Sequence, residues 1–158
     1  MAFLHHMGIT VSNIDTASAF YRDVTAGTID GPYEKSGPAV DAVTGFSGVT
    51  VFLAFVNIGG ETVLELAEYR NGSGEPISPE TNKPGVAHPA ITVEDLDGLL
   101  ERVSAMGYQP TSEPKTATSG PLEGYRYAYV LGPDNLRVEF LERPHLPTEV
   151  QPPSTARH

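Results

Sequence analysis

Gly85-Val86-Ala87-His88-Pro89-Ala90-Ile91-Thr92-Val93-Glu94-Asp95-Leu96-Asp97 is the stretch that decides the organisation of this chain, because an earlier segment repeats its pattern. Residues 6–15 are His-Met-Gly-Ile-Thr-Val-Ser-Asn-Ile-Asp, and every matched position lies 82 residues earlier. Both copies place a histidine before an Ile-Thr-Val run and follow it with Asn or Asp, then Ile or Leu, then Asp. A duplication of this length predicts two similar units that together bury a face neither could bury alone.

Each copy opens a unit with the same predicted order of strand, helix, loop and hairpin, set by hydrophobic periodicity, capping residues and turn residues. The first unit has a strand over 4–11, a helix from Asn13 to Gly27, a loop or lid over 31–48, and strands over 50–57 and 62–68. The second has a strand over 88–93, a helix from Asp95 to Gly107, a loop over 110–124, and strands over 125–131 and 136–141.

The two hairpins also match, since Val63–Glu68 parallels Arg137–Glu142 with an offset of 74 residues. We therefore predict an α+β fold of two paired modules within one domain over 1–143. The modules span about 1–70 and 86–143, and 71–85, rich in Gly, Pro and polar residues, is the linker. Residues 144–158 are predicted to be an unfolded tail, because they combine several prolines with few apolar residues.

The composition of the chain limits which partners and which location are expected for the protein. A net charge of −10 would repel a phosphate backbone, so nucleic acid is not expected as a partner. No apolar run approaches the roughly 20 residues that a membrane-spanning helix needs. The chain has no cysteine and no visible secretory signal, so a cytoplasmic location is expected.

Four polar positions occur in matched places of the two units: His6, Glu65, His88 and Glu139. The period of two in a strand puts Glu65 and Glu139 on the face opposite their apolar neighbours. If the two units pair about a pseudo-twofold axis, two imidazoles and two carboxylates meet. Such a set suits a divalent ion of iron, nickel, cobalt, manganese or zinc, with open positions for water or substrate.

The chain resembles the vicinal oxygen chelate superfamily, which includes glyoxalase I, methylmalonyl-CoA epimerase, extradiol dioxygenases and the bleomycin and fosfomycin resistance proteins. The motifs that carry the resemblance are Leu-His-His-Met-Gly-Ile-Thr-Val (4–11), Ala-Phe-Tyr-Arg-Asp-Val (19–24), Gly-Glu-Thr-Val-Leu-Glu-Leu-Ala-Glu-Tyr (60–69), residues 85–97 quoted above, and Leu-Gly-Pro-Asp-Asn-Leu-Arg-Val-Glu-Phe-Leu-Glu (131–142).

The resemblance covers about residues 3–143 and implies paired βαβββ modules that form a cleft around a divalent metal, commonly in a homodimer. His6, Glu65, His88 and Glu139 match the family's metal ligands. The repeat selects His6 over His5, which is expected to be an edge or interface residue. Pro89 departs from the family pattern and predicts a strand edge or bulge beside His88.

The full ligand set, with an acidic residue at Glu65, resembles that of the glyoxalase and epimerase branches. This resemblance implies a metal-dependent proton transfer on a small oxygenated substrate, by an epimerase, isomerase or lyase. Glu139 is the first choice of base and Glu65 the second. Tyr125, Arg126 and Tyr127 are candidates for orienting a substrate. One alternative is a non-haem Fe(II) dioxygenase that uses only His6, His88 and Glu139. Another is a resistance protein that sequesters its ligand without metal chemistry.

Overall fold

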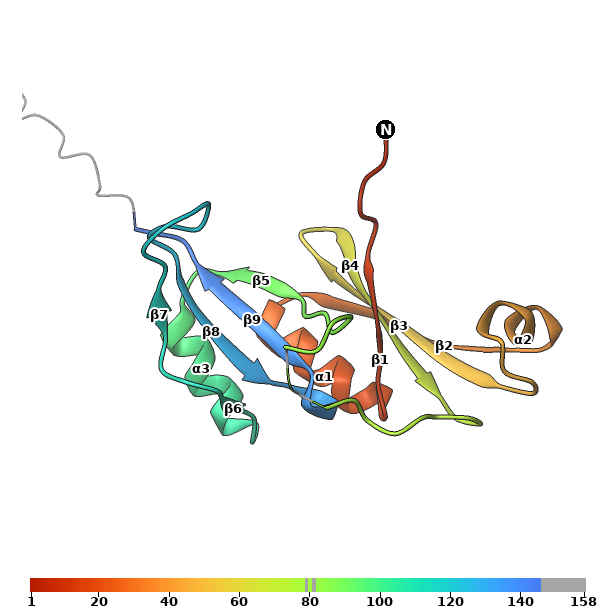
Figure 1. The fold of residues 1–158 in the computed structure, drawn as a ribbon. Helices are drawn as coiled ribbons and strands as arrows, with labels where there is room; N and C mark the ends of the chain where they lie inside the picture. Colours follow the sequence, from red (N-terminus) through yellow and green to blue (C-terminus); the bar gives the residue numbers. More distant parts are fainter. Residues whose placement is uncertain (79, 81, 146–158) are drawn as a thin grey trace, which may run out of the picture.

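The computed structural model describes residues 1–78, 80 and 82–145 (Figure 1). Residues 146–158, most of the tail predicted to be unfolded, lie outside the described residues. Two β-sheets lie on either side of helix α1 (Figure 1). Within the described part of the chain, no helix combines the length and the hydropathy needed to cross a bilayer.

The first sheet comes from the first unit and has the strand order β1-β4-β3-β2. Its elements are β1 (Met7–Thr10), α1 (Ile14–Thr25), β2 (Thr28–Ser36), α2 (Pro38–Thr44), β3 (Thr50–Ile58) and β4 (Glu61–Tyr69). The second sheet repeats this plan with the order β5-β9-β8-β6, and β7 also pairs with β8. Its elements are β5 (Ala90–Val93), α3 (Leu96–Ala105), β6 (Gln109–Pro110), β7 (Lys115–Thr116), β8 (Arg126–Leu131), the 3₁₀ turn η1 (Pro133–Asn135) and β9 (Arg137–Glu142). The predicted α+β class and βαβββ order are confirmed.

The prediction of a loop over 31–48 was wrong, because that region contains most of β2 and all of α2. Gly31 and Pro32 sit inside β2, where the pairing with β3 shifts register between Asp30 and Tyr33. Proline has no N–H to donate and is tolerated at a bulge or on an outer strand. β2 is the outer strand of its sheet, so the Gly-Pro pair that suggested a loop interrupts the strand without ending it. The predicted loop over 110–124 likewise holds the short strand β7.

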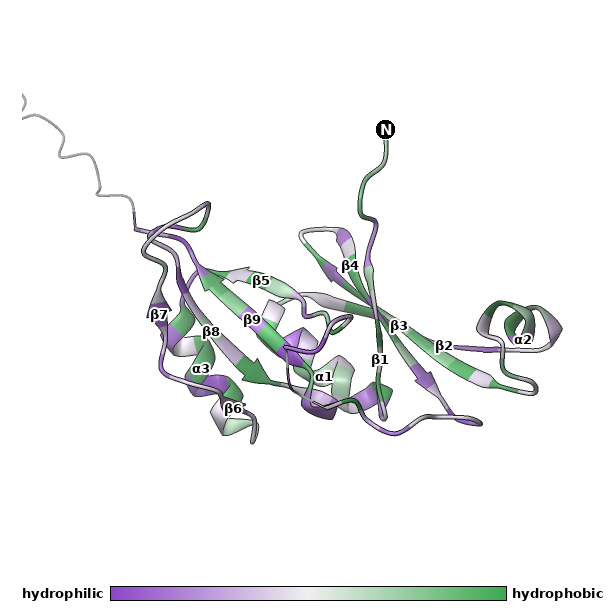
Figure 2. Cartoon of the chain, viewed as in Figure 1, coloured by the Kyte–Doolittle hydropathy of each residue, from purple (hydrophilic) through white to green (hydrophobic). Residues whose placement is uncertain are grey.

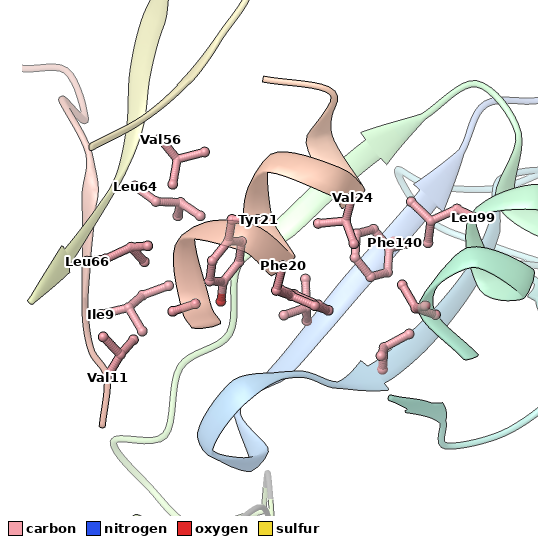
Figure 3. Close-up of a cluster of buried hydrophobic side chains, with 14 of the residues drawn as sticks. Ile9, Val11, Phe20, Tyr21, Val24, Val56, Leu64, Leu66, Leu99 and Phe140 are labelled. Carbon is pink, nitrogen blue, oxygen red and sulfur yellow. The ribbon is translucent and has the colours of Figure 1, made fainter. Parts of the chain in front are cut away.

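Helix α1 is buried from both sides (Figure 3). Tyr21 points toward Leu64 and Leu66 of the first sheet, whereas Phe20 and Val24 lie toward Phe140 of the second. Phe20 is fully buried, and its ring packs edge-on against Tyr108, 4.8 Å between centroids. A side chain at Gly132 would come within 3.1 Å of the same ring. Helix α1 of the first unit therefore contributes buried side chains to the hydrophobic cores of both units.

The two sheets use their faces in the same way. The strands alternate, with Leu64 and Leu66 or Val138 and Phe140 against the core, and Figure 2 shows the resulting hydrophobic and hydrophilic bands along β9. The faces turned away from the core carry Glu65 and Glu139, as the strand period predicted.

A glutamate on the last strand of each unit, half-buried at Glu68 and buried at Glu142, fixes the helix of that unit to the strand. Glu68 accepts a hydrogen bond from the Ile14 N–H (2.8 Å), and Glu142 accepts one from the Leu96 N–H (3.2 Å). These bonds act beside the predicted N-caps, since Asn13 and Asp95 accept from the N–H three residues on. The helices are therefore tied down at their N-termini, and with them the strands that carry the candidate site.

Candidate metal centre

The first His–Glu pair is formed by two neighbouring parallel strands. β1 pairs with β4 so that Gly8 lies opposite Glu65, and His6, two residues before Gly8, shares the face of Glu65. The His6 Nε2 atom lies 3.9 Å from Glu65 Oε2, and both side chains are half-buried. Gly8 places no side chain beside Glu65, and a Cβ there would make only an ordinary van der Waals contact, 4.0 Å from Glu65 Oε1.

His5 contacts the other nitrogen of the His6 ring. The two Nδ1 atoms are 2.7 Å apart and the rings meet edge to face. A hydrogen bond to one ring nitrogen fixes the tautomer and orientation of a histidine and leaves the other nitrogen for a metal. His5 is therefore placed to direct His6 Nε2 toward Glu65.

The second pair repeats this geometry on the other sheet. His88 Nε2 lies 3.2 Å from Glu139 Oε2, and Ala90, two residues after His88, pairs with Glu139. The Pro89 carbonyl accepts a hydrogen bond from the Glu139 N–H (3.0 Å), and β5 begins one residue later at the edge of its sheet. The strand edge predicted from Pro89 is confirmed.

One chain does not bring the two pairs together. Among the described residues, no three His, Cys, Asp or Glu side chains cluster where an ion could be held. Each sheet instead presents one imidazole nitrogen and one carboxylate on its outer face. Each pair is half of the predicted set, and its N and O donors fit a divalent transition metal.

Arg126, named from the sequence as a candidate for orienting substrate, has a different position. Its guanidinium donates to Glu142 and to Asp97 at the start of α3, both at 2.8 Å. This ion pair lies on the core side of the sheet, away from Glu139, so Arg126 anchors α3 and not a ligand.

Tyr129, which sequence reasoning did not name, lies directly beside the second pair. It pairs with Glu139 across the β8–β9 ladder, and its ring meets the His88 ring edge-on at 5.3 Å. Burial, and then the charge of Glu139 and a hydrogen bond to it, raise the pKa of the Tyr129 phenol. The repeat of the two hairpins could have pointed to Tyr129. It lies 74 residues after Phe55, the same offset that separates Glu65 from Glu139, and Phe55 is the cross-strand partner of Glu65.

Residues 3–140 match the model of the Glyoxalase/Bleomycin resistance protein/Dioxygenase superfamily, and the chain belongs to this superfamily. It is 29% identical over 150 residues to a 2-epi-5-epi-valiolone epimerase from an Actinomyces species, covering 89% of this chain and 79% of that protein.

Two solved structures share the fold. A glyoxalase family protein from Bacillus cereus superposes with a TM-score of 0.78 at 20% identity, covering 91% of this chain and 95% of the other. The fosfomycin resistance protein FosX from Listeria monocytogenes, solved with Mn(II) and a sulfate ion, gives a TM-score of 0.54 at 17% identity and coverages of 90% and 93%. The predicted superfamily is confirmed.

Proposed function

We propose that this protein is a divalent-metal-dependent enzyme that moves a proton next to a carbonyl group of a small oxygenated substrate, as an epimerase, isomerase or lyase. The observation that carries the proposal is the duplicated pair: His6 beside Glu65, and His88 beside Glu139, on the outer faces of two equivalent sheets. The relationship to the Actinomyces epimerase supports this class of reaction and suggests 2-epi-5-epi-valiolone as a substrate to test.

The complete site would be shared between two copies of the chain. The two pairs do not meet in one chain, and β1 and β5, the strands that begin within two residues after the histidines, are both edge strands of their sheets. In a twofold dimer, His6 and Glu65 of one copy would face His88 and Glu139 of the other, and symmetry would create the same site twice. This arrangement accounts for half-sites that a single chain leaves apart.

A bound divalent ion would supply a Lewis acid that stabilises negative charge on the substrate oxygen. The chain would supply the rest. His6 and His88 would hold the ion, and His5 would keep the His6 ring in orientation. One carboxylate, Glu139 or Glu65, would accept the proton from the carbon next to the carbonyl, and in an epimerisation the other carboxylate, in its protonated form, would deliver a proton to the opposite face of that carbon. Leu53 and Phe55, neighbours of Glu65 on β3, would help exclude water.

The dioxygenase alternative requires Glu65 to be a bystander. Glu65 has the same relation to His6 as Glu139 has to His88, and this equivalence favours the four-ligand enzyme over a three-ligand iron site. The sequestering alternative gives no reason for two His–Glu pairs at matched positions.

Metal analysis of the purified protein beside a His88→Ala variant tests the metal site. We expect a bound divalent ion in the first and its loss in the second. NMR of 2-epi-5-epi-valiolone incubated with the protein in D₂O should then show deuterium entering next to the carbonyl, without oxygen consumption. Absence of metal from both proteins would refute the enzyme, and oxygen uptake without deuterium incorporation would favour the dioxygenase.

A further inference from the structure

The two His–Glu pairs occupy equivalent positions but have different neighbours. Across the ladder, Glu139 faces Tyr129, whereas Glu65 faces Phe55. On the other side, Glu139 pairs with Ala90 and Glu65 with Gly8, neither of which has a polar side chain. The phenol oxygen of Tyr129 is therefore the polar difference between the cross-strand neighbours of the two carboxylates.

Tyr129 contacts both members of its pair. Its ring lies edge-on to His88, with an interplanar angle of 81°, and Tyr129 is the direct partner of Glu139 across the β8–β9 ladder, so its phenol lies on the face that carries Glu139. Glu139 is thus held between a phenol on β8 and the imidazole of His88, 3.2 Å away. The Glu139 side chain is 15% exposed.

Glu65 has a looser environment. Phe55 has no hydrogen-bond donor in its side chain, Gly8 has no side chain, and the nearest imidazole nitrogen lies 3.9 Å away. The Glu65 side chain is 28% exposed, nearly twice the value for Glu139. A carboxylate with fewer partners and more room loses less when it changes rotamer.

We propose that Tyr129 is a positioning residue that fixes Glu139 in its ligand orientation and makes the two carboxylates unequal, with Glu139 the fixed ligand and Glu65 the exchangeable one. This inference rests on the proposed metal site. It also ranks the bases anew: a carboxylate that must leave the ion to move a proton is better served by Glu65, which the sequence ranked second.

Phe55 and Tyr129 provide a matched pair of variants. Tyr129→Phe removes one oxygen and gives Glu139 the same direct cross-strand neighbour as Glu65, whereas Phe55→Tyr adds a phenol beside Glu65. Calorimetric titration with Mn(II) alone should show about 10-fold weaker binding for Tyr129→Phe, within the range for hydrogen-bond partners of metal ligands. Phe55→Tyr should bind Mn(II) at least as tightly as the wild type. Unchanged binding by Tyr129→Phe, with thermal unfolding also unchanged, would overturn the proposal.

The inequality of the carboxylates has its own test. Glu139→Gln should weaken Mn(II) binding more than Glu65→Gln does, and the visible spectrum of the Co(II)-loaded protein should change in Tyr129→Phe. Equal losses in the two glutamine variants would refute the assignment of fixed and exchangeable ligands.

Crystal structures of the metal-free wild type and Tyr129→Phe separate this inference from the proposed function. We expect one Glu139 rotamer at the phenol in the wild type and several in the variant. A Glu139 side chain turned away from Tyr129 in the wild type would overturn the positioning role, whether or not the protein binds metal. Failure of the wild type to bind Mn(II) would instead refute the metal site.

Discussion

A site shared between two chains predicts that two inactive variants restore each other. His6→Ala would remove a proposed ligand from the half-site on the first sheet, and His88→Ala would remove one from the half-site on the second. Each variant alone spoils both sites of its homodimer. In a mixed dimer, one site collects both substitutions, and the other combines intact His6 and Glu65 with intact His88 and Glu139.

The expected recovery follows from twofold symmetry. Random reassortment of equal amounts makes half of the dimers mixed, and one of the two sites in each is intact, so metal content should recover to about one quarter of the wild-type value per chain. The variants would be co-refolded from urea, loaded with Mn(II), dialysed and analysed for metal, with deuterium incorporation as a second readout.

A matched control uses two substitutions in the same half-site. His6→Ala mixed with Glu65→Gln leaves every site of the mixed dimer with one substituted ligand, so no recovery is expected. Failure of the His6→Ala and His88→Ala mixture to exceed this control, despite proven chain exchange, would show that the ligands do not come together across a dimer.

Three further predictions concern the scaffold. Phe20→Ala should destabilise the protein by about 3–5 kcal/mol, in one urea transition seen alike by tyrosine fluorescence and circular dichroism, because this ring packs between both units; two separate transitions would contradict the shared core. Glu142→Gln should cost about 2–3 kcal/mol in the same assay by weakening charge-assisted bonds from Leu96 and Arg126, and a loss below about 0.5 kcal/mol would be surface-like. Burial raises the pKa of the Glu68 carboxyl group, whereas the hydrogen bond from the Ile14 N–H and the charge and hydrogen bond of Arg70 lower it. The lowering effects together are larger, so the pKa lies below its ordinary value of 4.5. The wild type should therefore exceed Glu68→Gln in stability at neutral pH, and this advantage should disappear as the pH falls below 4.5 through the pKa of the folded carboxyl group. A pH-independent difference would refute the charge-based account.

Much of the fold follows from local pattern. Asn13 and Asp95 cap the two helices as predicted, and the apolar face of each helix is buried, whereas Met106, just beyond the end of α3, is exposed. β2 was missed because Gly31 and Pro32 have the local preferences of a turn, whereas pairing with β3 holds the strand together across its register shift.

Some features of the candidate site could also be predicted from the sequence, and others could not. Alternation along a strand fixes which face a side chain takes, so the outward position of Glu65 and Glu139 could be inferred from their apolar neighbours. The partner across the ladder depends on register, which no single segment encodes. The placement of Gly8 opposite Glu65, and of Tyr129 opposite Glu139, became visible only with the strands paired.

The sequence by itself determined that this protein is a duplicated α+β chain with a His and a Glu in each half, because repeat spacing and strand period are properties of the linear chain. Only the tertiary structure decided that these residues form two separate pairs, and that Phe20 and Tyr21 on one helix serve two sheets. The physical reason is that packing of α1 between the sheets sets how the units are placed. That placement depends on contacts between distant segments, which local preferences do not specify.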